Sequence, residues 1–334
     1  MRIGVLFFRS ATIALAGLVL TRCLTINAPF GNGDNSLHET RISGHGDAKI
    51  LWLPIDGFIS ARPNSQALGL VQHASTLTKV TRALDKAETD DAIKAVVLRI
   101  DSPGGTVSAS DEIYDRIKRF EARTGVPVIA SLGGVAASGG YYVAMSASRV
   151  IAEPTTITGS IGVIIVDVNA AGLMDKIGVT DTSVTSGPHK DLMSPLRPPK
   201  AEEQAIVQRV VDSLYHRFVS IVQTNRPDLD RSQLDTITDG RIFAADRARQ
   251  LGLVDAIGHT DDVIAAARDS AGLEEARVIR YYQGQRAPTT LGAAAYSSTT
   301  QPNALAGWLA QLGSSGAFDG AQPLYLWRGT SIER

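Results

Sequence analysis

The residues best suited to chemistry in this chain are a serine among small residues and a lysine about fifty positions further on. Ser138 lies in GGVAASGGYY, residues 133–142, and is followed by Gly139 and Gly140. A serine nucleophile needs this setting, because no bulky neighbour blocks the hydroxyl and nearby backbone N–H groups are free to face an oxyanion. Lys190, in SGPHKD, can supply the base. The pair indicates a Ser–Lys hydrolase rather than a Ser-His-Asp one.

Two further glycine-rich motifs can complete such a site. DSPGG, residues 101–105, favours a tight turn in which Gly104 or Gly105 points an N–H group into a cleft. With the N–H of Gly139 it would form a two-donor oxyanion hole, and each donor contributes about 3 kcal/mol in known hydrolases. Ser160, in TGSIG, is a candidate to hydrogen-bond the Lys190 amine and orient it.

Each of these residues also has an ordinary structural interpretation. Ser138 can be a helix N-cap, DSPGG a plain strand-to-helix turn, and Lys190 a solvated surface lysine. A lysine that acts as a base must be neutral at the working pH, which requires burial that a sequence cannot reveal. A histidine base is the other option, but none of the three candidates lies in a glycine-rich or strand-end setting; they are His189, His216 and His259.

The segments around these residues alternate between strand and helix patterns, which predicts a mostly parallel sheet with right-handed crossovers. Both glycine-rich turns follow apolar strands, at the sheet edge where open parallel sheets place their active sites. The expected strands are 50–55, 94–100, 127–132, 149–152 and 161–166. The expected helices are 75–86, 108–123, a start near Ser138, 200–224 and 261–271, with a helical or mixed segment at 234–256.

Composition excludes several classes of protein. The 334 residues carry a net charge of −1, without the basic stripe that a nucleic-acid surface needs. The single cysteine, Cys23, excludes an internal disulfide, and six scattered histidines give no zinc pattern, so we expect no metal and no cofactor.

The N-terminus has the pattern of an export signal. Arg2 and Arg9 precede an apolar run from Ala11 to Leu20, and Arg22 follows it. Counted from Ile3, the mostly apolar stretch reaches 18 residues, with Arg9 inside it, which is marginal for a membrane span. No A-x-A cleavage site follows, which favours a retained anchor over a cleaved signal. We assign residues 1–26 to this anchor or signal, 27–48 to a linker, and 49–282 to the catalytic domain. Residues 283–334 form a low-complexity tail with a possible short helix at 304–312.

In the order DSPGG, Ser138, TGSIG and Lys190, the motifs resemble those of the signal-peptide peptidase A family of serine proteases. GRIFAADRARQLGLVDAIG, residues 240–258, is similar to that family's downstream segment, and the resemblance covers about residues 49–270. It implies a ClpP/crotonase-like α/β fold, a spiral of ββα units with mostly parallel strands and C-terminal helices.

The same resemblance implies roles for individual residues. Ser138 would be the nucleophile, Lys190 the general base, and Ser160 the hydrogen-bond partner of the lysine. Gly139 and a glycine of Gly104-Gly105 would form the oxyanion hole. The chain length is similar to the short form of the family, which implies a homo-oligomer whose active sites are shared between subunits.

A membrane anchor with the catalytic domain on the periplasmic or extracellular side is also implied. The expected activity is a membrane-associated serine endopeptidase that degrades remnant signal peptides, and other unfolded chains. Two alternatives are a crotonase-like acyl-CoA enzyme, which needs acidic catalytic residues, and a non-catalytic scaffold with the same fold.

Overall fold

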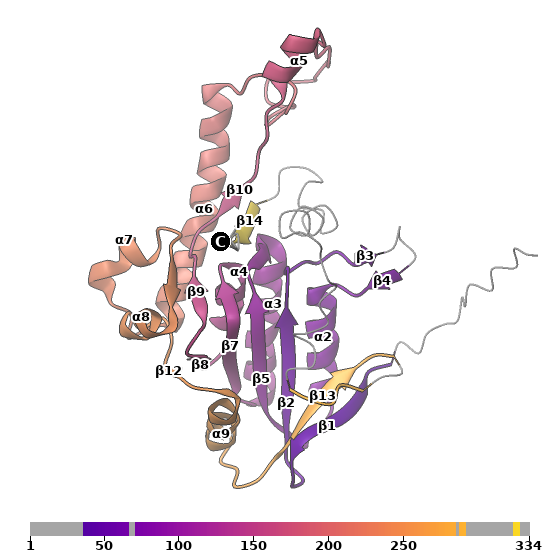
Figure 1. The fold of residues 1–334 in the computed structure, drawn as a ribbon, viewed down its shortest axis with the longest axis vertical. Helices are drawn as coiled ribbons and strands as arrows, with labels where there is room; N and C mark the ends of the chain where they lie inside the picture. The colour runs from indigo at the N-terminus through magenta and orange to yellow at the C-terminus, as the bar shows by residue number, and fades with distance from the viewer. Residues whose placement is uncertain (1–35, 67–70, 285–286, 292–322, 328–334) are drawn as a thin grey trace, which may run out of the picture. The chain divides into compact units, whose positions relative to one another are not determined.

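The structure, a computed structural model, describes the greater part of the chain (Figure 1): residues 36–66, 71–284, 287–291 and 323–327. The expected N-terminal anchor or signal and the possible helix at 304–312 lie outside these residues. Leu37–Tyr282 and Ala287–Arg334 belong to one compact unit, to which the following account is confined. No helix among the described residues is both long enough and apolar enough to cross a bilayer.

The main sheet has nine strands within the described residues, and its central strands are parallel. The spatial order is β1-β13-β2-β5-β7-β8-β12, while β9 also pairs with β7, and β11 with β9. Only the outlying pairs β1–β13 and β9–β11 are antiparallel. The strands are β1 (His38–Gly44), β2 (Lys49–Asp56), β5 (Ile93–Ser102), β7 (Val128–Ala137), β8 (Arg149–Ala152), β9 (Ile157–Gly159), β11 (Ile242–Ala244), β12 (Ala256–Ile257) and β13 (Arg277–Tyr282).

Helices cover both faces of this sheet, which explains why the central strands are apolar on both sides. In β2, Leu51 and Leu53 face one hydrophobic cluster, whereas Ile50 and Trp52 face the other. The first cluster lies under α2 (Thr76–Ala87), α3 (Val107–Thr124) and α4 (Gly139–Ala144), and the second under α9 (Thr260–Ser270). The predicted α/β layering is therefore confirmed.

A smaller antiparallel sheet lies beside α4, in the order β10-β14-β6. Its strands come from three distant parts of the chain: β6 (Gly104–Thr106), β10 (Ile164–Ile165) and β14 (Pro323–Leu326). A separate two-stranded sheet consists of β3 (Asn64–Gln66) and β4 (Val71–His73).

The remaining helices follow β10 in the chain. They are α5 (Ala171–Ile177), α6 (Ala201–Asn225), the 3₁₀ turn η1 (Arg231–Gln233), α7 (Leu234–Ile237) and α8 (Ala245–Gln250). The C-terminal half of α6 packs on the core through Phe218 and Val222, which are fully buried. Its N-terminal half is mostly exposed, and Val210, which belongs to the expected apolar stripe, is 46% exposed.

Three expectations differ from the structure. The strand expected at 161–166 is shorter, because only β10 (Ile164–Ile165) pairs with a neighbouring strand, and Ser160, with a positive φ of 51°, lies between it and β9. β1 lies within residues 27–48, the range expected to be a linker, because its alternating exposed and half-buried residues pair with β13. β14 lies within residues 283–334, the range expected to be a tail.

An ion pair between Arg226, at the C-terminal end of α6, and Asp255 connects α6 to β8. The Arg226 guanidinium donates to both carboxylate oxygens of Asp255, at 2.7 and 3.0 Å, and to Gly252 O at 2.9 Å. Asp255 also accepts from the backbone N–H of Val150 at 2.6 Å. Burial alone would raise the pKa of Asp255, but the hydrogen bonds from Arg226 and Val150 outweigh it and hold the pKa below its usual range.

This depressed pKa predicts acid sensitivity. The folded state binds the Asp255 proton less readily than the unfolded chain, whose aspartates titrate near ~3.9, so the stabilisation is present above that pH. It is lost as the pH falls through the lower folded-state value. We expect Asp255→Asn to lower the free energy of unfolding at neutral pH by about 2 kcal/mol and to flatten its decline in acid. Urea unfolding at several pH values measures both effects, and Asp47→Asn, at an exposed carboxylate, should change neither.

Candidate active site

Ser138 lies in the tight junction between β7 and α4. Its φ of 52° and ψ of −116° are rare for a residue with a side chain. Its N–H donates to Gly159 O at 2.8 Å, and its carbonyl accepts from Tyr142 N at 2.8 Å. The side chain makes no capping hydrogen bond, so the ordinary N-cap interpretation does not apply. The turn instead resembles the strained strand-to-helix turns on which hydrolases present a serine.

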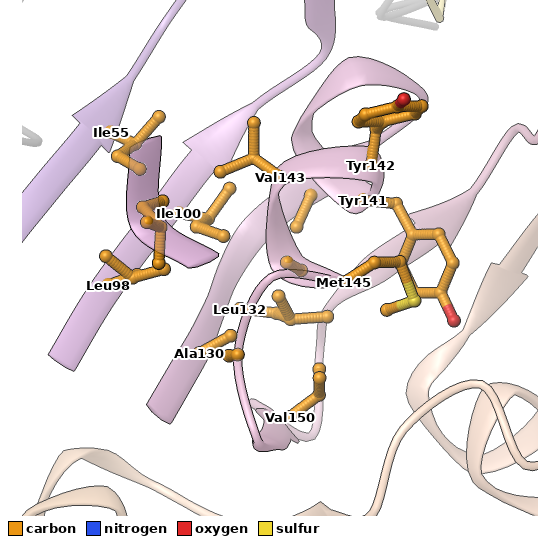
Figure 2. Close-up of a cluster of buried hydrophobic side chains, with 14 of the residues drawn as sticks. Ile55, Leu98, Ile100, Ala130, Leu132, Tyr141, Tyr142, Val143, Met145 and Val150 are labelled. Carbon is orange, nitrogen blue, oxygen red and sulfur yellow. The ribbon is translucent and has the colours of Figure 1, made fainter. Parts of the chain in front are cut away.

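The packing of α4 holds this turn in place. Figure 2 shows Tyr141 and Val143 of α4, and Met145 directly after it, among the side chains of the central strands. All six residues of the helix are buried, and Tyr141 also donates its hydroxyl to Leu253 O at 2.7 Å. Such a strained backbone costs about 1–3 kcal/mol, and the burial of α4 compensates for it.

The strain predicts an unusual order of stabilities. Glycine adopts the backbone angles of Ser138 without strain, so Ser138→Gly should unfold with a free energy about 1 kcal/mol higher than Ser138→Ala. At Ser108, an exposed position in α3, the order should be reversed, because glycine is about 1 kcal/mol worse than alanine within a helix. Denaturant unfolding of the four variants tests this, and the same order at both sites would contradict it.

The DSPGG turn lies directly against Ser138's helix. Ser102 Oγ donates to Gly57 O at 2.6 Å and accepts from Gly104 N at 3.0 Å, which closes the turn. Gly104 has a φ of 108°. A Cβ on Gly105 would lie 2.0 Å from Ile59 O, so only glycine fits there. Because neither glycine carries a side chain, the backbone of this turn can approach α4 closely.

Of the two glycines, Gly105 is the better candidate for an oxyanion donor. A Cβ on Gly139 would lie 3.1 Å from Gly105 N, so the backbones of Gly139 and Gly105 are adjacent. The N–H of Gly104 is already used by Ser102. The arrangement therefore favours the N–H groups of Gly105 and Gly139 as the donor pair.

Ser160 lies beside Ser138. In the parallel pair β7–β9, Ala137 lies opposite Gly159, so the two serines follow immediately at the ends of neighbouring strands. Both have positive φ and both are buried, with 7% of Ser160 and 1% of Ser138 exposed. The Ser160 N–H donates to Arg241 O at 2.7 Å. The structure thus brings together four elements of the expected site: Ser138, Ser160, Gly139 and the DSPGG turn.

Lys190 is not part of this cluster within one copy of the chain. It is exposed, in the segment between α5 and α6, and no hydrogen bond joins its Nζ to Ser138 Oγ among the described residues. Its neighbour His189 lies 3.5 Å from Glu202, in the first turn of α6. Phe218, at the other end of α6, contacts Tyr142, which follows Ser138 by one helical turn. The separation of 16 positions from Glu202 to Phe218 corresponds to about 24 Å of helix.

Among the described residues, the contacts of the three histidine alternatives are with residues other than Ser138. His189 pairs with Glu202, the ring of His216 lies tilted against that of Tyr215, and His259 is the N-cap of α9. Within the described part of the chain, no group of three or more His, Cys, Asp or Glu side chains is arranged to hold a metal ion.

Sequence reasoning missed two features of the site. Asp101 accepts from Val135 N at 3.1 Å and so fixes the strand end that leads to Ser138, a role that its position in DSPGG could have indicated. β14 lies against the DSPGG turn, and its apolar sequence PLYL was a strand signal within the expected tail.

Comparisons with known proteins agree with this arrangement. The family model described as Peptidase family S49 matches residues 121–274, and the one described as Clp protease matches residues 68–158. "Putative signal peptide peptidase SppA" of Enterococcus faecium is 36% identical over 258 residues, which cover 77% of this chain and 73% of that protein. "Putative protease slr0021" of Synechocystis sp. is 41% identical over 61% of this chain and 73% of its own.

Among solved structures, a 1510-N membrane-bound stomatin-specific protease in complex with a substrate peptide is similar to this chain. It is 18% identical, with a TM-score of 0.42, and the match covers 67% of this chain and 81% of that one. The long, well-covered match to the Enterococcus faecium protein confirms the resemblance seen in the motifs, and the Clp protease match confirms the ClpP-like fold. The chain belongs to peptidase family S49 and is a serine peptidase.

Proposed function

We propose that the chain is an endopeptidase in which Ser138 is the nucleophile and Lys190, from a neighbouring copy, is the general base. The observation that carries the proposal is the strained turn at Ser138, which places this serine beside the backbones of Gly139 and Gly105 and next to Ser160. A buried serine with two adjacent backbone donors is suited to acyl transfer.

The proposed reaction uses each of these groups. Neutral Lys190 Nζ accepts the Ser138 hydroxyl proton as Oγ attacks the peptide carbonyl. The N–H groups of Gly105 and Gly139 stabilise the resulting oxyanion, and Ser160 orients the lysine. The lysine then gives the proton to the departing amine, and water releases the acyl group in a second, equivalent step.

Exposed apolar side chains support a base supplied by a neighbouring copy. The segment that carries Lys190 and the adjoining part of α6 expose several large hydrophobic residues, whereas isolated soluble proteins keep such patches small. They are Val168, Leu173, Ile177, Val179, Val184, Leu196 and Val210. Val184 is 98% exposed, only six residues before Lys190. A second copy packed there would cover this surface and bring a lysine to a serine in a ring-like homo-oligomer.

The proposed substrates are remnant signal peptides and other unfolded chains at a membrane. The name of the Enterococcus faecium relative supports signal peptides, and the apolar N-terminal pattern supports an anchor with an exported catalytic domain over residues 49–282. An extended segment, β14, pairs with both β6 and β10 beside α4, and extended peptides add to strand edges of this kind by backbone hydrogen bonds.

A serine-reactive phosphonate tests the nucleophile. We expect one phosphonate per active subunit, attached to Ser138 and absent from Ser138→Ala, as read by intact mass and peptide mapping. Ser146→Ala, which removes another buried serine, should remain labelled. Labelling of a different serine would contradict the proposal, and no labelling at all would favour a crotonase-like acyl-CoA enzyme or a scaffold.

A further inference from the structure

The segment that carries Lys190 has neither regular structure nor a hydrophobic core to hold it in place. Residues 178–200, between α5 and α6, form no helix or strand, and none of them is buried. Lys190 lies in a run of turns, residues 187–193, which we call the lysine turn, and its N–H donates to Gly187 O at 3.2 Å. Since a general base has to be held within hydrogen-bond reach of its nucleophile, polar contacts must fix this turn.

Arg197 links the lysine turn to α6. Its Nε and Nη2 donate to the two carboxylate oxygens of Asp191, the residue after Lys190, at 2.6 and 2.9 Å. Its Nη1 and Nη2 donate to the two carboxylate oxygens of Glu203, in the first turn of α6, at 2.9 and 2.7 Å. Two backbone bonds complete the set, to Asp191 O and Pro198 O, both at 3.2 Å. We call the chain Asp191–Arg197–Glu203 the arginine bridge.

The arginine bridge is charged and largely shielded from water. Only 18% of the Arg197 side chain and 3% of the Glu203 side chain are exposed. The hydrogen bonds from Arg197 lower the pKa of Asp191 to about 2 and hold that of Glu203 below its usual range, so both carboxylates are ionised at neutral pH. The planar guanidinium binds each carboxylate through two bonds, a geometry that a lysine ammonium cannot reproduce.

The other polar contacts of the segment do not replace the arginine bridge. Asn169 Nδ2 donates to Arg197 O at 2.6 Å, which anchors the segment only after the lysine turn. His189, within the turn, lies 3.5 Å from Glu202, too far for a strong hydrogen bond, and the Glu202 side chain is 78% exposed. The arginine bridge is therefore the main polar link between the lysine turn and α6.

We propose that Arg197 is a positioning residue: by holding the lysine turn on α6, it presents the Lys190 amine to Ser138 of the neighbouring copy. This inference rests on the proposed role of Lys190. In this role Arg197 transfers no proton and acts only by restricting the positions that the lysine can adopt. Its loss should therefore lower the rate of the chemical step and leave peptide binding unchanged.

Steady-state kinetics of Arg197→Lys tests this role, because the variant keeps the positive charge but loses the planar fork. We expect kcat to fall about tenfold or more, with KM changed less than about twofold, since a small misplacement of a catalytic group is costly. Arg116→Lys is the matched control. Arg116 also binds two carboxylates, Asp85 at 2.7 Å and Glu88 at 2.8 Å, with 12% of its side chain exposed, but it joins α3 to α2. Its kcat should match that of the wild type, and a wild-type kcat in Arg197→Lys would overturn the proposal.

Mixed assemblies separate positioning from a merely structural role. Arg197→Ala subunits mixed with Ser138→Ala subunits should hydrolyse peptide faster than Arg197→Ala alone, because some sites combine an intact serine with an intact lysine turn. Mixed with Lys190→Ala subunits they should not, because both changes affect the lysine turn. Recovery with Lys190→Ala would overturn the proposal, and so would dissociation of Arg197→Ala in native mass spectrometry, since the arginine would then act on assembly. Arg197→Lys replaces the alanine variant in these mixtures if the latter does not fold.

The positioning role and the proposed function fail in different ways. Full activity in Lys190→Ala would reject the proposed base and this inference with it. An inactive Lys190→Ala beside a fully active Arg197→Lys would reject the positioning role alone. If Ser138→Ala recovers neither with Lys190→Ala nor with Arg197→Ala, sharing between copies is rejected, and the kcat of Arg197→Lys then decides whether the arginine positions the lysine within one subunit.

Discussion

Ser138→Ala and Lys190→Ala should each reduce peptide hydrolysis by about 10⁴-fold or more, with the fold unchanged. Nucleophile and base act in one step, so the loss of either should cost nearly as much as the loss of both. Residual activity comes only from peptide binding and the donor pair of Gly105 and Gly139. Initial rates on a fluorogenic peptide, normalised to the folded fraction by circular dichroism, measure the effect.

The lysine arm of this experiment has a matched control. Lys176, in the last turn of α5, is another exposed lysine that precedes Lys190 in the chain. Lys176→Ala should retain hydrolysis if Lys190 has a specific role and is not one of several interchangeable charges. Full activity in Lys190→Ala would exclude this lysine as the base and return attention to His189.

Local patterns predicted most of the fold because they are set by short-range physics. The apolar run KAVVLRI, residues 94–100, predicts a strand buried on both faces, and it lies within β5. Ala95 and Val97 face one hydrophobic cluster, and Val96 and Leu98 face the other. The helix expected near Ser138 begins at Gly139, because small residues let α4 pack closely: a Cβ on Gly140 would lie 2.8 Å from Ser102 O. The parallel order then brings both glycine-rich turns to one edge.

Features that depend on contacts distant in sequence were not predictable in the same way. The apolar stripe of α6 suggested packing along its whole length, yet only the half around Phe218 reaches the core. PLYL carries a local strand signal, but its partners β6 and β10 are distant in sequence, so its place in a sheet depends on tertiary structure. Of the strand expected at 161–166, only Ile164 and Ile165 pair, because their partner β14 comes from a distant part of the chain.

The position of Lys190 is the most consequential of these cases. Its spacing from Ser138 suggested a partner, but the fold places it at the far end of α6, about 24 Å of helix from the core contact at Phe218. A flexible side chain cannot bridge such a distance within one copy. The exposed residues Leu173, Ile177 and Val184 on the same segment indicate where a second copy would pack.

A mixture of inactive Ser138→Ala and inactive Lys190→Ala subunits should therefore regain hydrolysis. If each site takes its serine from one copy and its lysine from the next, random assembly of equal amounts pairs two intact residues at about a quarter of the sites. The expected rate is accordingly about a quarter of the wild-type rate. The double variant mixed with wild-type protein is the matched control for dilution, and native mass spectrometry establishes that subunits exchange.

A dyad within one subunit predicts a different result, because every copy in the mixture then lacks one of its own two residues. No recovery after proven exchange would reject the shared site and require Lys190 to reach Ser138 of its own chain.

A third variant, Leu173→Asp, tests the shared site through assembly. Leu173 lies on the exposed face of α5, where we expect a neighbouring copy, so the added charge should dissociate the assembly. If sites are shared between copies, Leu173→Asp should lower the hydrolysis rate in proportion to the loss of oligomer. Dilution of the wild-type protein should also lower the rate per subunit.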